Sequence, residues 1–186
     1  MEIKEIWSVV NSIESTVTKN ECEFLFSLAR NCQGRGVIVE IGSYKGRSTA
    51  TLALGSLTGA KSPIFAIDPQ IEIPRASDAL HVVLKKHLEI LNVAQIVTLI
   101  KDFSQNIVTS WQAPIELLFI DGDHEYESVK RDFYDWYPHI ITNGVVAFHD
   151  TCHDQLPGPH RLVQELKGTK LLNSWILIDS LSAGVK

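Results

Sequence analysis

The chain of 186 residues has the length of one domain with a sizeable hydrophobic core. Hydrophobic residues make up 45% of it, charged residues 21%, and the net charge is -5, so binding driven by nucleic-acid phosphates is not expected. No apolar run is long enough to span a membrane, and residues 1–10 lack the pattern of a signal peptide. The three cysteines are widely spaced and form no CxxC pair. Together these features predict a reduced, cytoplasmic protein without a membrane partner.

The first part of the sequence predicts two amphipathic helices, at residues 3–14 and 19–32, because apolar residues recur there at helical spacing. The sequence "TKNE", from Thr18 to Glu21, has the pattern of a capping box for the second helix.

From residue 36 onward, short apolar runs alternate with amphipathic segments. This alternation predicts an α/β fold with a mostly parallel sheet and helices on both faces. The expected strands are 37–42, 63–68, 96–102, 115–121 and 144–150, the expected helices are 46–57, 77–91, 126–136 and 159–166, and residues 171–186 are expected to form two antiparallel strands. We expect a single domain over residues 1–186, in which a helical cap (1–35) precedes the α/β core (36–186).

Acidic side chains stand at or near the carboxyl end of each expected core strand. They are Glu40, Asp68, Asp102, Asp121 and Asp150, the last preceded by His149. Parallel sheets bind ligands outside the carboxyl ends of their strands. Because clustered like charges repel one another, this cluster predicts a cation, a polyhydroxy ligand or both.

The loop "EIGSYKGRST", residues 40–49, follows the first core strand. Its glycines, Gly42 and Gly46, allow a ligand to approach the backbone, and the next helix offers unpaired N–H groups. The G-x-x-x-G spacing is neither that of a dinucleotide site nor that of a phosphate loop. We expect the loop to receive a smaller anion such as a carboxylate; the alternative is a plain strand-to-helix turn.

The next two strand ends suggest contacts with a nucleoside. Asp68 can accept hydrogen bonds from both hydroxyls of a ribose, although an acid before Pro69 is also typical of a turn. Asp102 can accept from an amine while Phe103 covers a base. The alternative for Asp102 is a solvated loop acid.

The segments "VIVEIGSYKGRST" (37–49), "FIDGDHEYESVKRDFYDW" (119–136) and "GVVAFHDT" (144–151) resemble the class I S-adenosylmethionine-dependent methyltransferases. Within that class the chain is most similar to the small metal-dependent family that includes macrolide sugar O-methyltransferases. The resemblance implies a Rossmann-like sheet of seven strands with an antiparallel last strand. It also implies S-adenosylmethionine as the cofactor, and the residues expected to bind it are Glu40, Gly42, Ser43, Tyr44, Gly46, Ser48, Asp68, Asp102, Phe103, Ser104 and Asp121.

In the resembling family the acid at the position of Asp121 binds a metal ion, and the histidine at the position of His124 is the catalytic base. The last core strand of that family supplies a pair of acidic ligands, where this chain has His149 and Asp150. The expected metal ligands are therefore Asp121, His149 and Asp150, with Mg²⁺ as the cation, or Mn²⁺ because imidazole suits Mg²⁺ less well. The alternative for His124 is a structural hydrogen bond to the neighbouring strand end.

The expected activity is methyl transfer to a hydroxyl of a small molecule such as a sugar or another polyhydroxylated natural product. Two alternatives stay open: a non-catalytic module that binds S-adenosylmethionine or a nucleoside, and a dinucleotide oxidoreductase. The segment 153–162 is a candidate loop on the acceptor side, and a homodimer that completes the pocket is expected. Arg131 and Asp132 are expected on a solvated helix face.

Overall fold

The computed structural model describes residues 3–70, 79–152 and 157–186. Its helices are α1 (Ile3–Ser12), α2 (Lys19–Asn31), α3 (Arg47–Thr58), α4 (Leu80–Ile90), α5 (Ser104–Ile107), α6 (Tyr126–Trp136) and α7 (Pro157–Lys167), with short 3-10 helices at Ala94–Ile96, Val108–Ser110 and Tyr137–His139. Its strands are β1 (Val37–Ile41), β2 (Ile64–Ile67), β3 (Val97–Ile100), β4 (Ile115–Ile120), β5 (Ile140–Phe148), β6 (Asn173–Ile178) and β7 (Leu181–Val185). Within the described part of the chain, no helix is long and apolar enough to cross a membrane.

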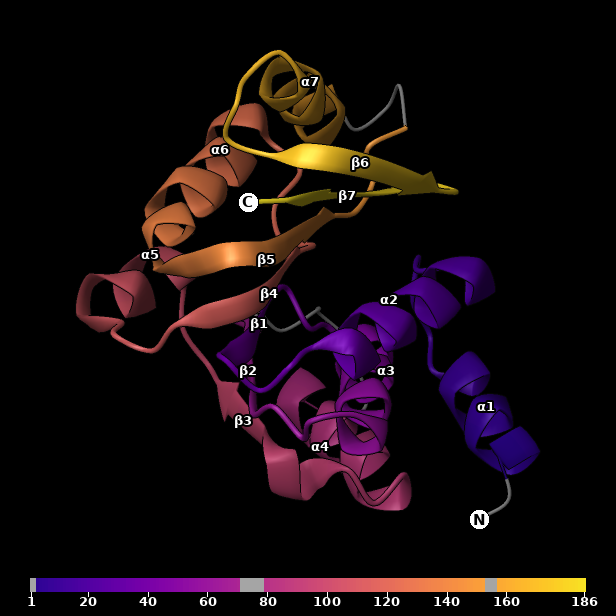
Figure 1. Cartoon of the computed structure of the whole chain (residues 1–186). Helices are drawn as coiled ribbons and strands as arrows, with labels where there is room; N and C mark the ends of the chain where they lie inside the picture. The colour runs from indigo at the N-terminus through magenta and orange to yellow at the C-terminus, as the bar shows by residue number, and fades with distance from the viewer. Residues whose placement is uncertain (1–2, 71–78, 153–156) are drawn as a thin grey trace.

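The strands form one seven-stranded sheet in the order β3-β2-β1-β4-β5-β7-β6 (Figure 1). The first five pair in parallel, whereas β7 runs antiparallel to both of its neighbours, β5 and β6. The expected mostly parallel sheet with an antiparallel last strand is therefore confirmed. The strand order reverses between β1 and β4, and in such sheets a crevice opens at the carboxyl ends of the strands on either side of the reversal.

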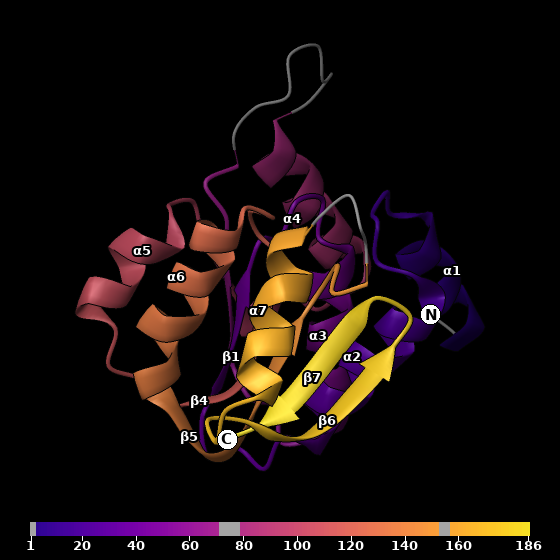
Figure 2. The same ribbon diagram turned by 90° about the horizontal axis from the view of Figure 1, so that it is seen from above.

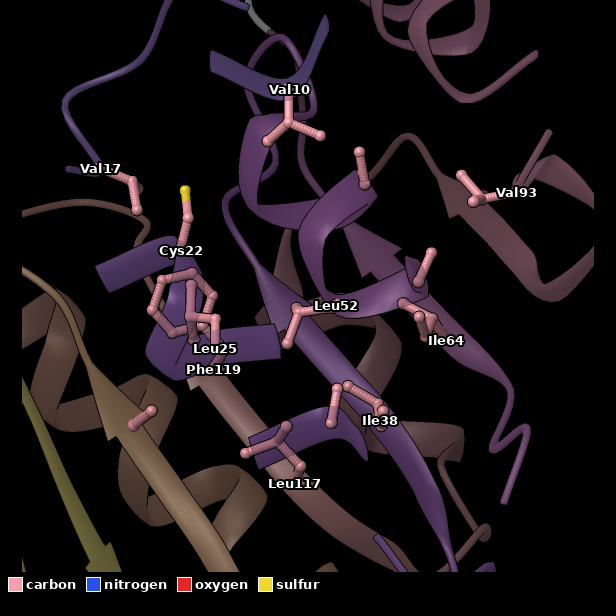
Figure 3. Close-up of a cluster of buried hydrophobic side chains, with 14 of the residues drawn as sticks. Val10, Val17, Cys22, Leu25, Ile38, Leu52, Ile64, Val93, Leu117 and Phe119 are labelled. Atoms are coloured by element: carbon pink, nitrogen blue, oxygen red, sulfur yellow. The ribbon is translucent and has the colours of Figure 1, made fainter. Parts of the chain in front are cut away.

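Helices cover both faces of the sheet, with α1 to α4 on one side and α5 to α7 on the other (Figure 2). On the first side Leu25, Leu52 and Phe119 are buried in one hydrophobic cluster (Figure 3). On the second side Phe133 of α6 packs in a separate cluster with Leu162 of α7. Each such side chain stabilises the fold by about 1.5–3 kcal/mol, so the two layers hold the sheet rigidly between them.

Two local features fix the edge of the sheet that carries the polar residues. The capping box is confirmed, since Thr18 Oγ1 accepts the N–H of Glu21 while the Glu21 carboxylate accepts the N–H of Thr18. Gly42, directly after β1, has φ +88°, and a Cβ atom there would lie 2.0 Å from the carbonyl oxygen of Asp121. Only glycine therefore allows the ends of β1 and β4 to approach so closely.

The expected boundaries differ most from the structure at β5. The strand was expected at 144–150 and instead begins at Ile140. A bulge, in which Asn143 has φ +62°, lets the strand include the four residues before Gly144. It ends at Phe148, and Asp150 turns out of the sheet with φ +56°. The start of the helix expected at 77–91 lies partly outside the described residues, and α4 begins at Leu80.

Candidate functional site

A cavity of about 880 Å³ lies at the carboxyl ends of β1, β2 and β4, as the strand-end rule predicts. Its wall also includes residues 14–16, which connect α1 to α2. Of the residues expected to bind the cofactor, those that line it are Gly42, Ser43, Tyr44, Gly46, Ser48, Asp68, Phe103, Ser104 and Asp121. His124 also lines the wall, whereas Glu40 and Asp102 do not.

Asp68 fixes the conformation of the loop after β1. The Oδ2 atom of this residue accepts the backbone N–H groups of Ser43 and Tyr44, both at 2.8 Å, and its Oδ1 accepts the N–H of Gln70 at 2.6 Å. Asp68 thus performs the turn role that was the alternative to ribose binding. Because a carboxylate has about four lone-pair sites, three backbone contacts leave capacity for a ligand hydroxyl as well.

Beside this loop, Ser43 presents a buried hydroxyl that has no hydrogen-bond partner among the described residues. Tyr44 has φ +44° and donates its hydroxyl to Glu14 Oε1 at 3.0 Å, which ties the loop to the helical cap. Gly46 precedes α3 with φ +88°, and no side chain caps the start of that helix. The N–H groups at the start of α3 therefore face the cavity region without a side-chain acceptor.

Glu40 lies beneath the loop and is fully buried. Its Oε2 accepts the hydroxyl of Thr49 at 2.5 Å, and burial raises the pKa of its carboxyl to about 8. Asp102 lies outside the wall and accepts the N–H of Phe103 and the side-chain amide of Asn106, both at 2.7 Å. In the described structure these two acids therefore support the loops that carry the neighbouring wall residues.

Asp132 is a wall residue that the sequence analysis missed, and the expectation that it lies on a solvated helix face is wrong. The residue is 8% exposed and accepts the hydroxyl of Ser104. Burial raises the pKa of its carboxyl to about 6. Its helical spacing relative to Val129 and Trp136, which both face the core, was the signal that places it inward.

Asp121 and His124, which line the cavity, form a compact cluster with Asp150, which is buried behind the wall. One donor atom from each lies within 4.8 Å of the other two. His124 Nε2 is 2.8 Å from Asp150 Oδ2, and this contact raises the pKa of the imidazole although burial opposes it. Burial raises the pKa of Asp121, with partial compensation from its contact with His149.

His149 lies behind this cluster and is 2% exposed. Its Nδ1 is 3.1 Å from Asp121 Oδ1 and 3.2 Å from Asp150 Oδ2, and both are charge contacts without hydrogen-bond geometry. Its Nε2 is 3.1 Å from Glu21 Oε2, a second residue that the sequence analysis did not include in the site. Burial lowers the pKa of His149, but the three acidic neighbours outweigh it and raise the pKa to about 12.

The donor atoms of the cluster fit a single divalent cation. Two carboxylates and an imidazole within 4.8 Å of one another are the donor types that bind Mn²⁺ or Zn²⁺, and the two carboxylates alone suit Mg²⁺ with its retained waters. Asp121 and Asp150 are thus brought together as expected. His149 would have to leave its acidic neighbours to reach a cation, whereas His124 already lies beside Asp121 and Asp150.

The segment 153–162, expected as a loop on the acceptor side, lies partly outside the described residues.

Comparison with known proteins identifies a family match and solved structures of the same fold. Residues 39–151 match the family described as a methyltransferase domain. An uncharacterised protein of Sinorhizobium fredii is 30% identical over 122 residues, which are 61% of this chain but only 13% of that protein. An O-methyltransferase from Bacillus cereus, solved with S-adenosylhomocysteine, has a TM-score of 0.70 at 18% identity over 98% of this chain and 90% of its own. CalS11, a TDP-rhamnose 3'-O-methyltransferase of calicheamicin biosynthesis, has a TM-score of 0.64 at 18% identity over 98% of this chain and 91% of its own.

Proposed function

The chain belongs to the methyltransferase domain family of class I, S-adenosylmethionine-dependent enzymes, and from this premise we propose that it methylates a hydroxyl of a small molecule with the assistance of a divalent cation. The observation that carries the proposal is that one cavity joins a cofactor-type loop, Gly42–Ser48, to Asp121 and His124, whose donor atoms form an acid–imidazole cluster with Asp150 just behind the cavity wall. A volume of about 880 Å³ is at the upper end of the range of about 300–1,000 Å³ for ligand sites, which suits a cofactor and an acceptor together.

We assign the cofactor to the part of the cavity near β1, β2 and α5. The free N–H groups at the start of α3 and the Ser43 hydroxyl suit the methionine carboxylate. Asp68 would accept from ribose hydroxyls with its remaining lone pairs. Phe103, which is 47% exposed on the wall, would cover the adenine, while Ser104 and Asp132 border it.

Methyl transfer is a direct displacement that depends mainly on positioning. The acceptor oxygen forms a bond to the methyl carbon while the sulfur–carbon bond breaks, and the electron pair of that bond stays on sulfur, which becomes a neutral thioether. We assign His124 as the base that takes the hydroxyl proton, since its imidazole lies on the cavity wall beside the two acids. A cation held by Asp121 and Asp150 would lower the pKa of an acceptor hydroxyl bound next to it.

The acceptor class follows from the same cluster. A cation with two carboxylate ligands keeps positions for two substrate oxygens, so adjacent hydroxyls on a sugar or another polyhydroxylated molecule fit. The structurally similar CalS11 is a TDP-rhamnose 3'-O-methyltransferase, which supports this choice. The expected homodimer, the cytoplasmic location and the absence of a nucleic-acid partner stay predictions.

The test is calorimetric titration of the metal-stripped protein with S-adenosylmethionine, with and without Mg²⁺ or Mn²⁺, and with NAD as a control. We expect a micromolar dissociation constant for the cofactor, and cation binding that the isosteric pair Asp121→Asn plus Asp150→Asn abolishes. Methyl transfer to a panel of sugars with adjacent hydroxyls then separates the enzyme from a non-catalytic binding module. Binding of NAD without S-adenosylmethionine would contradict the proposal.

A further inference from the structure

The carboxylate of Glu21 is fully buried behind the acid–imidazole cluster, although it belongs to α2 of the helical cap. Its Oε2 accepts the N–H of Thr18 at 2.7 Å and lies 3.1 Å from His149 Nε2. Its Oε1 accepts the N–H and the hydroxyl of Ser180, between β6 and β7, at 2.8 and 2.7 Å. A capping box requires only the contact with Thr18, so the other three contacts indicate a second role.

His149 connects Glu21 to the cluster. One nitrogen of its buried ring faces Glu21, and the other faces both Asp121 and Asp150. The orientation of the ring is therefore set from both sides. Without the Glu21 carboxylate, Nε2 would keep only the hydroxyl of Ser180, at 3.4 Å, among the contacts of the described residues.

We propose that Glu21 is a positioning residue, which through His149 holds the carboxylates of Asp121 and Asp150 in the arrangement that receives the cation and the acceptor. The physical reason is repulsion between the two carboxylates, which the imidazole between them offsets only while its ring is held in place. Residues behind metal ligands commonly change metal affinity or activity by about 10–100-fold. This inference rests on the proposed function and adds a contribution of the helical cap to it.

The test compares Glu21→Gln with Glu116→Gln, a matched control. Glu116 is also buried, at 4% exposed, but it accepts the N–H groups of Gln33 and Arg35 near the start of β4, at the opposite edge of the sheet. We expect Glu21→Gln to raise the dissociation constant for Mn²⁺ about 10–100-fold and to change that for S-adenosylmethionine less than twofold. Glu116→Gln should leave both constants within twofold of the wild type.

A third variant, Thr18→Ala, separates positioning from capping. It removes the side-chain cap of α2 but leaves the contact between Glu21 and His149, so we expect a lower melting temperature with unchanged Mn²⁺ affinity. A fall in Mn²⁺ affinity as large as that in Glu21→Gln would mean that loosening of α2 is the cause, and would overturn the inference. Unchanged Mn²⁺ affinity in Glu21→Gln would also overturn it.

A second readout does not depend on the proposed function. The carboxyl ¹³C signals of Asp121 and Asp150, recorded without metal or cofactor, should shift in Glu21→Gln and stay in place in Glu116→Gln. If the wild-type protein bound neither S-adenosylmethionine nor Mn²⁺, the proposed function would fail. The carboxyl signals would still test whether Glu21 positions Asp121 and Asp150. Signals of Asp121 and Asp150 that do not move in Glu21→Gln would refute it.

Discussion

Replacement of Asp132 by asparagine should stabilise the protein at neutral pH. Burial raises the pKa of Asp132 from an ordinary value of 3.8 to about 6, so the folded state binds its proton more tightly than the unfolded state does. The charged carboxylate therefore destabilises the fold, and this cost develops as the pH rises from about 4 to about 6. A difference of about two pH units, at about 1.36 kcal/mol per unit, gives about 3 kcal/mol at full ionisation.

Asparagine has nearly the same shape and can still accept the hydroxyl of Ser104, so Asp132→Asn removes mainly the charge. Urea unfolding between pH 4 and pH 8 should show equal stability of the two proteins near pH 4 and a gain of about 3 kcal/mol for the variant above pH 7. The control is Glu89→Gln, an exposed acid on α4 that does not act on Asp132, which should change stability by less than about 0.5 kcal/mol. Asp132→Asn would refute the reasoning if it were no more stable than the wild type at pH 7.5.

Three further predictions concern the site. His124→Gln should lower kcat by about 10²–10⁴-fold while calorimetry shows an unchanged dissociation constant for Mg²⁺, which the two carboxylates alone suit; loss of Mg²⁺ binding would instead identify His124 as a ligand. Gly42→Ala should abolish measurable binding of S-adenosylmethionine, because its Cβ would lie 2.0 Å from the carbonyl oxygen of Asp121, whereas Gly168→Ala, with its nearest contact at 3.3 Å, should bind normally. Chelation of divalent cations should lower kcat at least tenfold, and added Mg²⁺ or Mn²⁺ should restore it; full activity in the chelator would contradict metal assistance.

The order of helices and strands could be predicted because most of them follow the hydrophobic pattern of their own residues. Apolar strands alternate with amphipathic segments, and the capping box from Thr18 to Glu21 marks the start of α2 as expected. The bulge in β5 could not be predicted in this way, since "ITNG" reads as a turn. Ile140 joins the strand by pairing with Ile115 of β4, and the N–H of Asn143 is donated to the carbonyl oxygen of Lys186 just after β7. Tertiary pairing there overrides the local preference.

Site residues could be predicted where their position at the end of a strand places them on the cavity wall. They could not be predicted where an acidic side chain instead binds nearby backbone or side-chain groups. Gly42, Asp68 and Asp121 lie on the cavity wall because strand ends converge at one edge of the sheet. The sequence gives no sign that Asp102 turns back onto α5. It also gives no sign that Glu21, which is about 100 residues before Asp121 in the chain, lies behind the cluster, because only the packing of α2 against the sheet brings them together.

The charges of the cluster explain why the helical cap and the β6–β7 turn contribute to this edge of the sheet. Asp121, Asp150 and Glu21 bring three carboxylates into one largely buried region, which is costly unless charge is offset within it. The imidazole of His149 contacts all three and offsets part of this charge, while Ser180 and Thr18 donate hydrogen bonds to the acid farthest from the cavity. His149 and, when protonated, His124 supply at most two positive charges against the three carboxylates, so the cluster keeps an excess of negative charge. The excess negative charge favours the binding of a divalent cation at this cluster. A cation bound there would hold an acceptor hydroxyl close to His124.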